Sequence, residues 1–136
     1  MKTDFSLHEL SRLSGHEMTG LNEIIETAQR IRESGVDIIL VSMGARGILL
    51  VSEKDQCLAS PPEVDVVNTI GAGDSAVAGF VYGMATGKSL QESLICAVAA
   101  GTATTLRPGP ALCTKDDFHK LVPQVKLKKG DFLRSS

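Results

Sequence analysis

The residues most suited to chemistry lie between positions 67 and 80, where the sequence is V-N-T-I-G-A-G-D-S-A-V-A-G-F. A carboxylate, Asp74, directly follows a glycine-rich turn at the expected start of a helix. Glycines allow close approach and unusual dihedral angles, so the N–H groups of Gly71, Ala72 and Gly73 can point into one concavity with the helix dipole behind it. Such a turn could hold a phosphoryl group while Asp74 accepts a proton from an attacking hydroxyl. The alternative is an acidic residue that only stabilises a helix N-terminus.

The same turn matches the loose dinucleotide-binding pattern G-x-G-x-x-G/A over residues 71–76. Its surroundings argue against that function, because the acidic residue about 20 positions later, Glu92, lies in a helix-capping sequence with no second strand before it. Asp74 would also set a negative charge against a pyrophosphate. No G-x-x-x-x-G-K-[ST] occurs in the chain, so a P-loop ATPase is not indicated.

Alternating helical and extended patterns predict an α/β domain that carries this turn. Apolar residues recur at helical spacing over residues 21–31, and Gly35 follows as a C-cap. The continuous apolar runs 38–41 and 48–51 predict two buried strands. The loop between them contains the glycines of a turn, and it could either reach the phosphates of ATP or form a plain hairpin turn.

The segment around the glycine-rich turn is predicted to be a strand over 64–67, then the turn, then a helix from about Asp74 to Ala85 that Gly87 closes. Ser89 and Glu92 form a capping box that opens the next helix, whose apolar stripe is expected in the core. Thr114 with Asp117 predicts the cap of a last helix ending near Pro123, and the tail 126–136 is expected to be a solvated basic stretch.

Three ordered segments resemble the ribokinase/PfkB family of carbohydrate kinases. V-S-M-G-A-R-G at 41–47 looks like the family's nucleotide-binding segment, G-A-G-D-S within 67–80 resembles its second signature, and 99–113 looks like its adenine-pocket region. The phosphofructokinase branch fits best. The resemblance implies a ribokinase-like three-layer α/β/α fold.

The resemblance also implies an ATP-dependent kinase that transfers the γ-phosphoryl group to a sugar hydroxyl. Asp74 would be the catalytic base, and the amides of Gly71, Ala72 and Gly73 would neutralise the charge on the phosphoryl oxygens. Thr69 could bond a phosphate or simply pack in a strand. The residues implied at the nucleotide are Ser42, Gly44, Gly47, Asn68, Thr69, Gly71, Gly73, Val98 and Thr102.

Two cations are implied as well. Family members carry an N-x-x-E motif that organises Mg²⁺, and Glu9 falls at its glutamate position, acting through water because Mg²⁺ keeps much of its hydration shell. Ser6 replaces the asparagine, so Ser6-x-x-Glu9 could equally be a capping box. Many relatives also bind a monovalent cation such as K⁺ through backbone carbonyls. Position matching places that site at Asn68, Ile70, Thr104, Arg107 and Gly109.

The length of 136 residues is short for this family, whose members run to about 300 residues, so we expect residues 1–136 to be the C-terminal nucleotide-binding and catalytic portion of the domain. The N-terminal sugar-binding half and its lid would then be absent. The expected substrate is fructose 6-phosphate, favoured by residues 99–113, with fructose 1-phosphate and tagatose 6-phosphate close behind. The alternative is a catalytically inactive nucleotide-binding remnant.

Composition favours a cytoplasmic protein, with 43% hydrophobic residues, 22% charged residues and a formal net charge of -2. That charge argues against a nucleic-acid surface, and no apolar run approaches the roughly 20 residues that span a bilayer. The three cysteines show no C-x-x-C pair, which is typical of reduced thiols without zinc. The expected partner is a small sugar phosphate, and the intact protein is expected to be a homo-oligomer.

Overall fold

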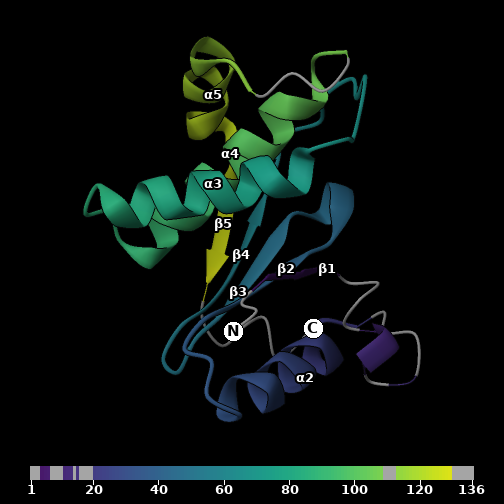
Figure 1. Ribbon diagram of the computed structural model, residues 1–136, viewed down its shortest axis with the longest axis vertical. Coiled ribbons are helices and arrows are strands. Elements are labelled where there is room, and N and C mark those ends of the chain that lie inside the picture. The colour runs from purple at the N-terminus through teal and green to yellow at the C-terminus, as the bar shows by residue number, and fades with distance from the viewer. Residues whose placement is uncertain (1–3, 7–10, 14, 16–19, 109–112, 130–136) are drawn as a thin grey trace. The chain divides into compact units, whose positions relative to one another are not determined.

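The computed structural model describes residues 4–6, 11–13, 15, 20–108 and 113–129. The chain, whose ribbon is drawn in Figure 1, divides into two compact units. The first comprises Met1–Gly44, Ile48–Leu58 and Lys128–Ser136, and the second comprises Ala45–Gly47 and Ala59–Leu127.

The first unit is built on strands β1 (Asp4–Ser6), β2 (Ile39–Ser42) and β3 (Ile48–Val51). β1 is parallel to β2, whereas β2 and β3 are antiparallel, with Ile39 opposite Val51. All four residues of β3 are buried, which explains the continuous apolar run. The expected strand, loop and strand are therefore confirmed. The full strand order is β1-β2-β3-β4-β5, with β4 at Gln56–Ser60 and β5 at Lys126–Lys129.

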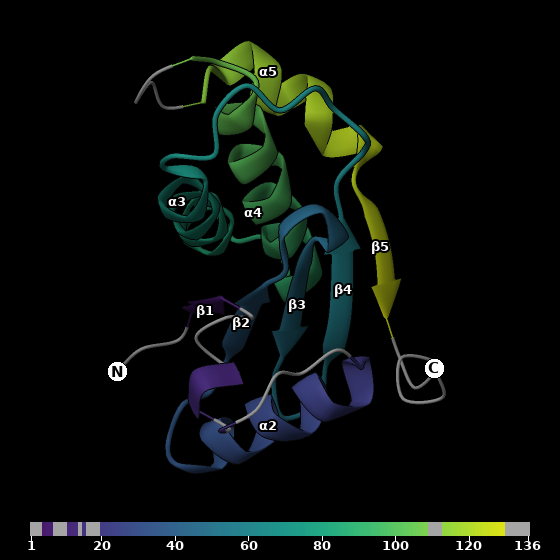
Figure 2. The same ribbon diagram turned by 90° about the vertical axis from the view of Figure 1, so that its right-hand side faces the viewer.

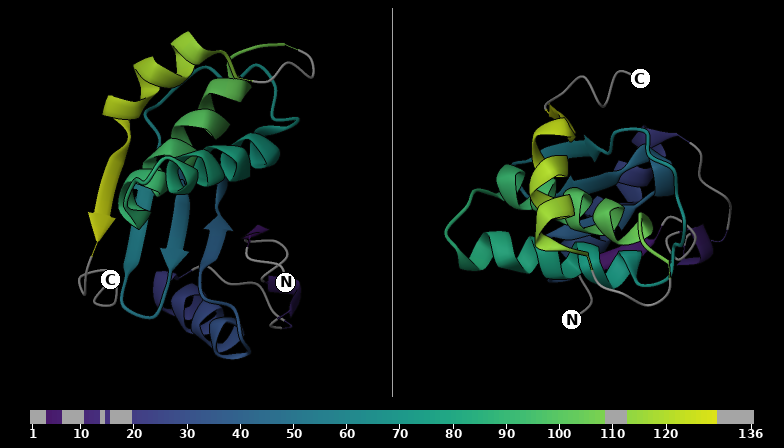
Figure 3. Two further views of the ribbon diagram at one scale, coloured as in Figure 1. Left: turned by 60° about the vertical axis from the view of Figure 1, so that its left-hand side comes forward. Right: turned by 90° about the horizontal axis from the view of Figure 1, so that it is seen from above.

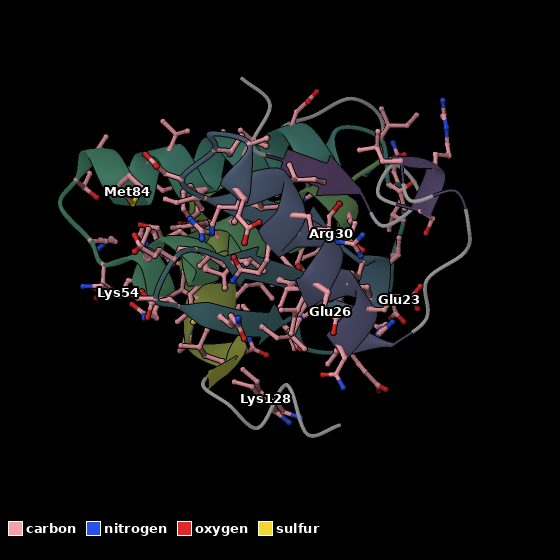
Figure 4. The ribbon with its side chains drawn as sticks, turned by 90° about the horizontal axis from the view of Figure 1, so that it is seen from below. Glu23, Glu26, Arg30, Lys54, Met84 and Lys128 are labelled. Carbon is pink, nitrogen blue, oxygen red and sulfur yellow. The ribbon has the colours of Figure 1, made fainter. Side chains whose placement is uncertain are left out.

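Helix α2 (Leu21–Glu33) packs against β2 and β3 with its apolar face (Figure 2). Its residues Ile24, Ile25 and Ala28 join the core of this unit, as the helical spacing predicted. The opposite face carries charge. Glu26 and Arg30 are exposed there, and Figure 4 shows both side chains along this helix.

The second unit contains an antiparallel hairpin of helices, α3 (Ala72–Ala85) and α4 (Leu90–Thr105), which lie side by side in Figures 1 and 2. Glycines of α3 face α4 so closely that a larger side chain would collide. A Cβ on Gly79 would lie 2.6 Å from the carbonyl oxygen of Cys96, and a Cβ on Gly83 would lie 2.6 Å from Ser93 Oγ. Glycine is needed there for close approach of the two backbones.

The caps predicted for the later helices are confirmed. Ser89 Oγ accepts the Glu92 amide at 3.1 Å, and the Glu92 carboxylate accepts the Ser89 amide at 3.0 Å. Helix α5 (Lys115–Leu121) is followed by a short 3-10 turn, η2 (Val122–Gln124), and α5 packs against α4 (Figure 3). No helix among the described residues is both long and apolar enough to cross a membrane.

Three segments differ from what the sequence predicted. No strand forms at 64–67, because the amide of Val67 donates to the carbonyl of Thr105 at the end of α4, and both Val66 and Val67 are 57% exposed. Helix α3 begins at Ala72, earlier than expected, since Gly71 serves as its N-cap. Residues 126–129 of the basic tail form β5, in which Lys126 and Lys128 are exposed, and exposed lysines are typical of an edge strand.

Candidate active site

The glycine-rich turn is shaped by bonds made within a few residues of it. Asn68 Oδ1 accepts the amide of Ile70 at 2.9 Å, which closes a small side-chain turn. Gly71 then adopts φ 82° and ψ -3°, a left-handed conformation that disfavours any residue with a Cβ. The amide of Ser75 donates to the carbonyl of Gly71 at 2.9 Å, which is the first i to i−4 bond at the start of α3.

Three amides of this turn are left available. Those of Gly71, Gly73 and Asp74 donate no hydrogen bond to any residue that the structure describes, whereas the amide of Ala72 donates to the carbonyl of Thr69 at 3.3 Å. Gly73 and Asp74 are the second and third residues of α3, so their N–H groups point out of the helix N-terminus. A phosphate oxygen is a natural partner for N–H groups in this position.

Asp74 occupies the first turn of α3 with an exposed side chain. Its carboxylate makes no hydrogen bond or ion pair with the described residues, and no side chain caps α3. Asp74 therefore does not act as a hydrogen-bonding cap, and its charge interacts favourably with the helix dipole. An exposed carboxylate beside free amides is available to a hydroxyl that attacks a bound phosphoryl group.

The end of α4 fixes the approach to this turn. The carbonyl of Thr105 accepts the amides of Val67 at 2.7 Å and Asn68 at 3.2 Å. Nearby, the hydroxyls of Thr104 and Ser75 share a hydrogen bond of 2.6 Å. The structure thus brings Asn68 and Thr104, two residues of the expected cation site, to the same end of the α3–α4 hairpin.

The other residues of the expected cation sites are placed as follows. Ile70 is 68% exposed beside the turn. The side chain of Arg107 forms an ion pair with Asp117, with 2.9 Å between Nε and Oδ2, which joins the end of α4 to the start of α5. Gly109 and Glu9 lie outside the described residues. Among the residues that are described, no three His, Cys, Asp or Glu side chains gather as a metal site.

The nucleotide residues expected on α4 differ in exposure. Val98 is 3% exposed, so it packs in the interior of its unit, whereas Thr102 is half-buried and its carbonyl accepts the hydroxyl of Thr105 at 2.6 Å. In the other unit, Ser42 is half-buried at the end of β2, and Gly44 is exposed.

Gly47 is buried with φ 105°, and packing alone explains why it is glycine. A Cβ at this position would overlap the carbonyl oxygen of Ala59 and lie 2.8 Å from Ser60 Cα. The hydroxyl of Ser60 also donates to the carbonyl of Arg46 at 3.0 Å, which holds the loop against β4.

Comparison with known proteins identifies the family. A model of the pfkB family carbohydrate kinases matches residues 5–117. The chain belongs to this family. The 1-phosphofructokinase of Borreliella burgdorferi is 37% identical over 124 residues, which are 90% of this chain and 40% of that protein. The ATP-dependent 6-phosphofructokinase isozyme 2 of Escherichia coli is 39% identical over 114 residues, 83% of this chain and 37% of that protein.

Solved structures confirm the ribokinase-like fold of this pfkB chain. Phosphofructokinase-2 from Escherichia coli in complex with potassium superposes with a TM-score of 0.83 at 36% identity, covering 89% of this chain and 40% of that one. Ribokinase from Thermotoga maritima shares the fold, with a TM-score of 0.76 at 24% identity, over 86% of this chain and 40% of its own. The chain thus spans about 40% of the length of these relatives.

Sequence patterns missed two features of the site. The amide of Asp74 itself is available to an anion, whereas only the amides of the three preceding residues were expected to be. The bond between Ser75 and Thr104 was not foreseen either, because two hydroxyl residues 29 positions apart carry no pairing signal in one sequence. Only the position of Ser75 next to Asp74 could have drawn attention to it.

Proposed function

We propose that this chain is the ATP-binding and catalytic portion of a sugar-phosphate kinase, which transfers the γ-phosphoryl group of ATP to a hydroxyl of fructose 6-phosphate or a related ketohexose phosphate. The observation that carries the proposal is the exposed Asp74 carboxylate directly beside the unengaged amides of Gly73 and Asp74. Membership of the pfkB carbohydrate kinases supports it.

In the proposed reaction, Asp74 accepts the proton of the sugar hydroxyl as its oxygen attacks the γ-phosphorus. A new oxygen–phosphorus bond forms, the bond to the bridging oxygen breaks, and ADP leaves with the electron pair. The amides of Gly71, Gly73 and Asp74 would donate to the phosphoryl oxygens as they gain negative charge, and fixed donors cost no reorganisation at that moment. The helix dipole adds to this stabilisation.

The amides of Gly71, Gly73 and Asp74 at the start of α3 are free to donate hydrogen bonds to the phosphates of ATP. Mg²⁺, when bound, would neutralise phosphate charge. We propose that Glu9 binds this Mg²⁺ through a water molecule. Potassium remains a proposal at the carbonyls of Asn68, Ile70, Thr104, Arg107 and Gly109, and one of the similar structures is a potassium complex of phosphofructokinase-2.

The sugar substrate is also a proposal. Relatives of similar identity carry the names 1-phosphofructokinase and 6-phosphofructokinase isozyme 2. Fructose 6-phosphate stays the first choice, as residues 99–113 suggested. A cytoplasmic location and a homo-oligomeric assembly complete the proposal, and one similar structure is a tetrameric form of phosphofructokinase-2.

A second candidate is a nucleotide-binding protein without catalysis, because the amides at the start of α3 would hold phosphates whether or not a sugar hydroxyl reaches Asp74. The two candidates agree on ATP binding and differ only in whether a sugar-dependent reaction follows.

The experiment combines two measurements on the purified chain. ADP formation is followed with Mg-ATP and potassium in the presence of fructose 6-phosphate, fructose 1-phosphate or tagatose 6-phosphate, and ATP affinity is measured by calorimetry. Sugar-dependent turnover that falls by about 10² to 10⁴ in Asp74→Asn, with ATP affinity retained, would establish the kinase and the base. ATP binding without turnover would favour the second candidate, and absence of both would refute both candidates.

A further inference from the structure

The first turn of α3 has no side-chain cap, and only the Asp74 charge favours its start. Its N-cap is Gly71, which offers no side-chain acceptor, and Gly73 inside the turn has low helix propensity. An isolated helix with this start would fray at its first turn. A phosphate site needs the same turn to be held in one geometry.

Helix α4 supplies contacts at this turn. A Cβ on Gly101 would lie 3.2 Å from the carbonyl oxygen of Ala72, so the backbones are close at the first residue of α3. The bond between Ser75 and Thr104 lies on the next turn of the interface, with the two residues 4% and 2% exposed. Ser75 is also the residue whose amide closes the first turn by bonding the Gly71 carbonyl at 2.9 Å.

The hydroxyl pair can satisfy all of its contacts at once. Thr104 Oγ1 lies 2.6 Å from Ser75 Oγ and 3.1 Å from the carbonyl oxygen of Ala100. Each hydroxyl has one proton and can also accept, so one donates within the pair while the Thr104 proton can serve the Ala100 carbonyl. A buried pair with both oxygens satisfied favours one arrangement, because separating them would leave unpaired polar atoms.

We propose that Ser75 and Thr104 are positioning residues that anchor the phosphate-binding turn and Asp74 to helix α4. Asp74 directly precedes Ser75, so fixing Ser75 against α4 also fixes the backbone that carries the exposed Asp74 side chain. The anchoring itself follows from the contacts above. Its effect on catalysis rests on the proposed kinase function.

The first test measures anchoring without any reaction. Amide hydrogen exchange of Ser75, relative to that of Val81 in the middle of α3, reports local opening of the first turn. In Thr104→Val, which keeps the shape and removes the hydroxyl, we expect this relative exchange to rise about threefold to tenfold. Thr104→Ser retains the hydroxyl and should restore the wild-type value.

Ser93→Ala is the matched control. Ser93 is also fully buried on the α4 face toward α3, but its hydroxyl has no hydrogen-bond partner in the described structure, and it lies beside Gly83 at the far end of the hairpin. Removing this hydroxyl should leave the relative exchange of Ser75 unchanged. If Thr104→Val fails to fold, Ser75→Ala removes the same bond from the other side, with Ala76 as the reporting amide.

Equal relative exchange in wild type, Thr104→Val and Ser75→Ala would overturn the anchoring proposal, whatever the chain catalyses. Where wild type turns over a sugar phosphate, Thr104→Val should lower kcat about tenfold with little change in KM for the sugar, and Ser93→Ala should lower neither. An unchanged kcat would overturn the catalytic part. Absence of turnover in wild type counts against the proposed function, and the exchange measurement still decides the anchoring.

Discussion

Replacing Gly47 by alanine tests whether packing alone demands glycine in the loop between β2 and β3. The residue has φ 105°, and a Cβ would overlap the carbonyl oxygen of Ala59 and lie 2.8 Å from Ser60 Cα. The obstacles are backbone atoms of β4, so no side-chain rotation can relieve the collision. Either the loop or the strand must move.

The expected cost follows from two contributions. Holding an alanine at a φ that L-residues rarely adopt costs about 1–3 kcal/mol, and overpacking a tight contact costs about 1–3 kcal/mol more. Gly47→Ala should therefore lower the free energy of unfolding by roughly 2–6 kcal/mol, a large part of the 5–15 kcal/mol typical of a domain. Gly44→Ala is the matched control, because Gly44 has φ 59° but nothing within 4 Å of its Cβ position. It should cost only about 1–2 kcal/mol.

Urea unfolding followed by far-UV circular dichroism measures the difference. Taking the middle of each range, about 4 and about 1.5 kcal/mol, and a slope of about 2 kcal/mol per molar urea, the midpoint of Gly47→Ala should lie roughly 1 M below that of Gly44→Ala. Coincident midpoints would refute the reasoning, because they would show that the loop moves away from β4 at little cost. In that case, the reason for glycine at position 47 would have to be contact with the bound nucleotide.

Four further predictions concern the second unit. Gly79→Ala should lower the free energy of unfolding by about 1–3 kcal/mol, because its Cβ would lie 2.6 Å from a carbonyl oxygen of α4. Gly73→Ala, with nothing within 4 Å, should leave stability unchanged or raise it by up to about 1 kcal/mol, and urea unfolding of both variants checks this. The hydrogen bond from the Arg107 side chain is the main cause that holds the pKa of Asp117 below its ordinary 3.8, and a hydrogen bond with Thr114 lowers it further. The stability that this pair adds is present above that value and is lost as pH falls through the lowered pKa. Stability curves of wild type and Arg107→Ala should therefore converge in acid and separate at neutral pH, and parallel curves would contradict this. Cys113 is half-buried while the other two cysteines are buried, so iodoacetamide should label it first, as mass spectrometry of the native protein can show.

Much of the fold could be predicted because its signals are local. The apolar spacing of α2, the two apolar runs and the capping box at Ser89 each act within one element or its ends, and each is confirmed. Strand β4 was not predicted, since its five residues show neither a continuous apolar run nor strict alternation. Four of its five residues are buried, and the burial of a short segment of mixed polarity leaves no pattern in a single sequence.

The glycine-rich turn at the start of a helix was predicted from the sequence, and its role as a phosphate site stays a prediction. The sequence located the turn and Asp74, because a carboxylate after G-A-G is recognisable by type and spacing. The sequence could not show which amides of the turn already donate to other groups of the protein. Which amides are free depends on the bond from Ala72 to the Thr69 carbonyl and on Gly71 as the N-cap, and both follow from the three-dimensional path of the turn.

The glycines show most clearly why residue type alone leaves such roles open. Gly47 and Gly73 both lie in segments that resemble nucleotide-binding motifs, yet their surroundings differ. The fold itself requires glycine at 47, because backbone atoms of β4 fill the space of a side chain. At 73 neither a neighbouring atom within 4 Å nor a positive φ requires it. A glycine that the fold does not need is what the proposed phosphate site would require, because a ligand held by the free amides beside Asp74 would approach this backbone closely.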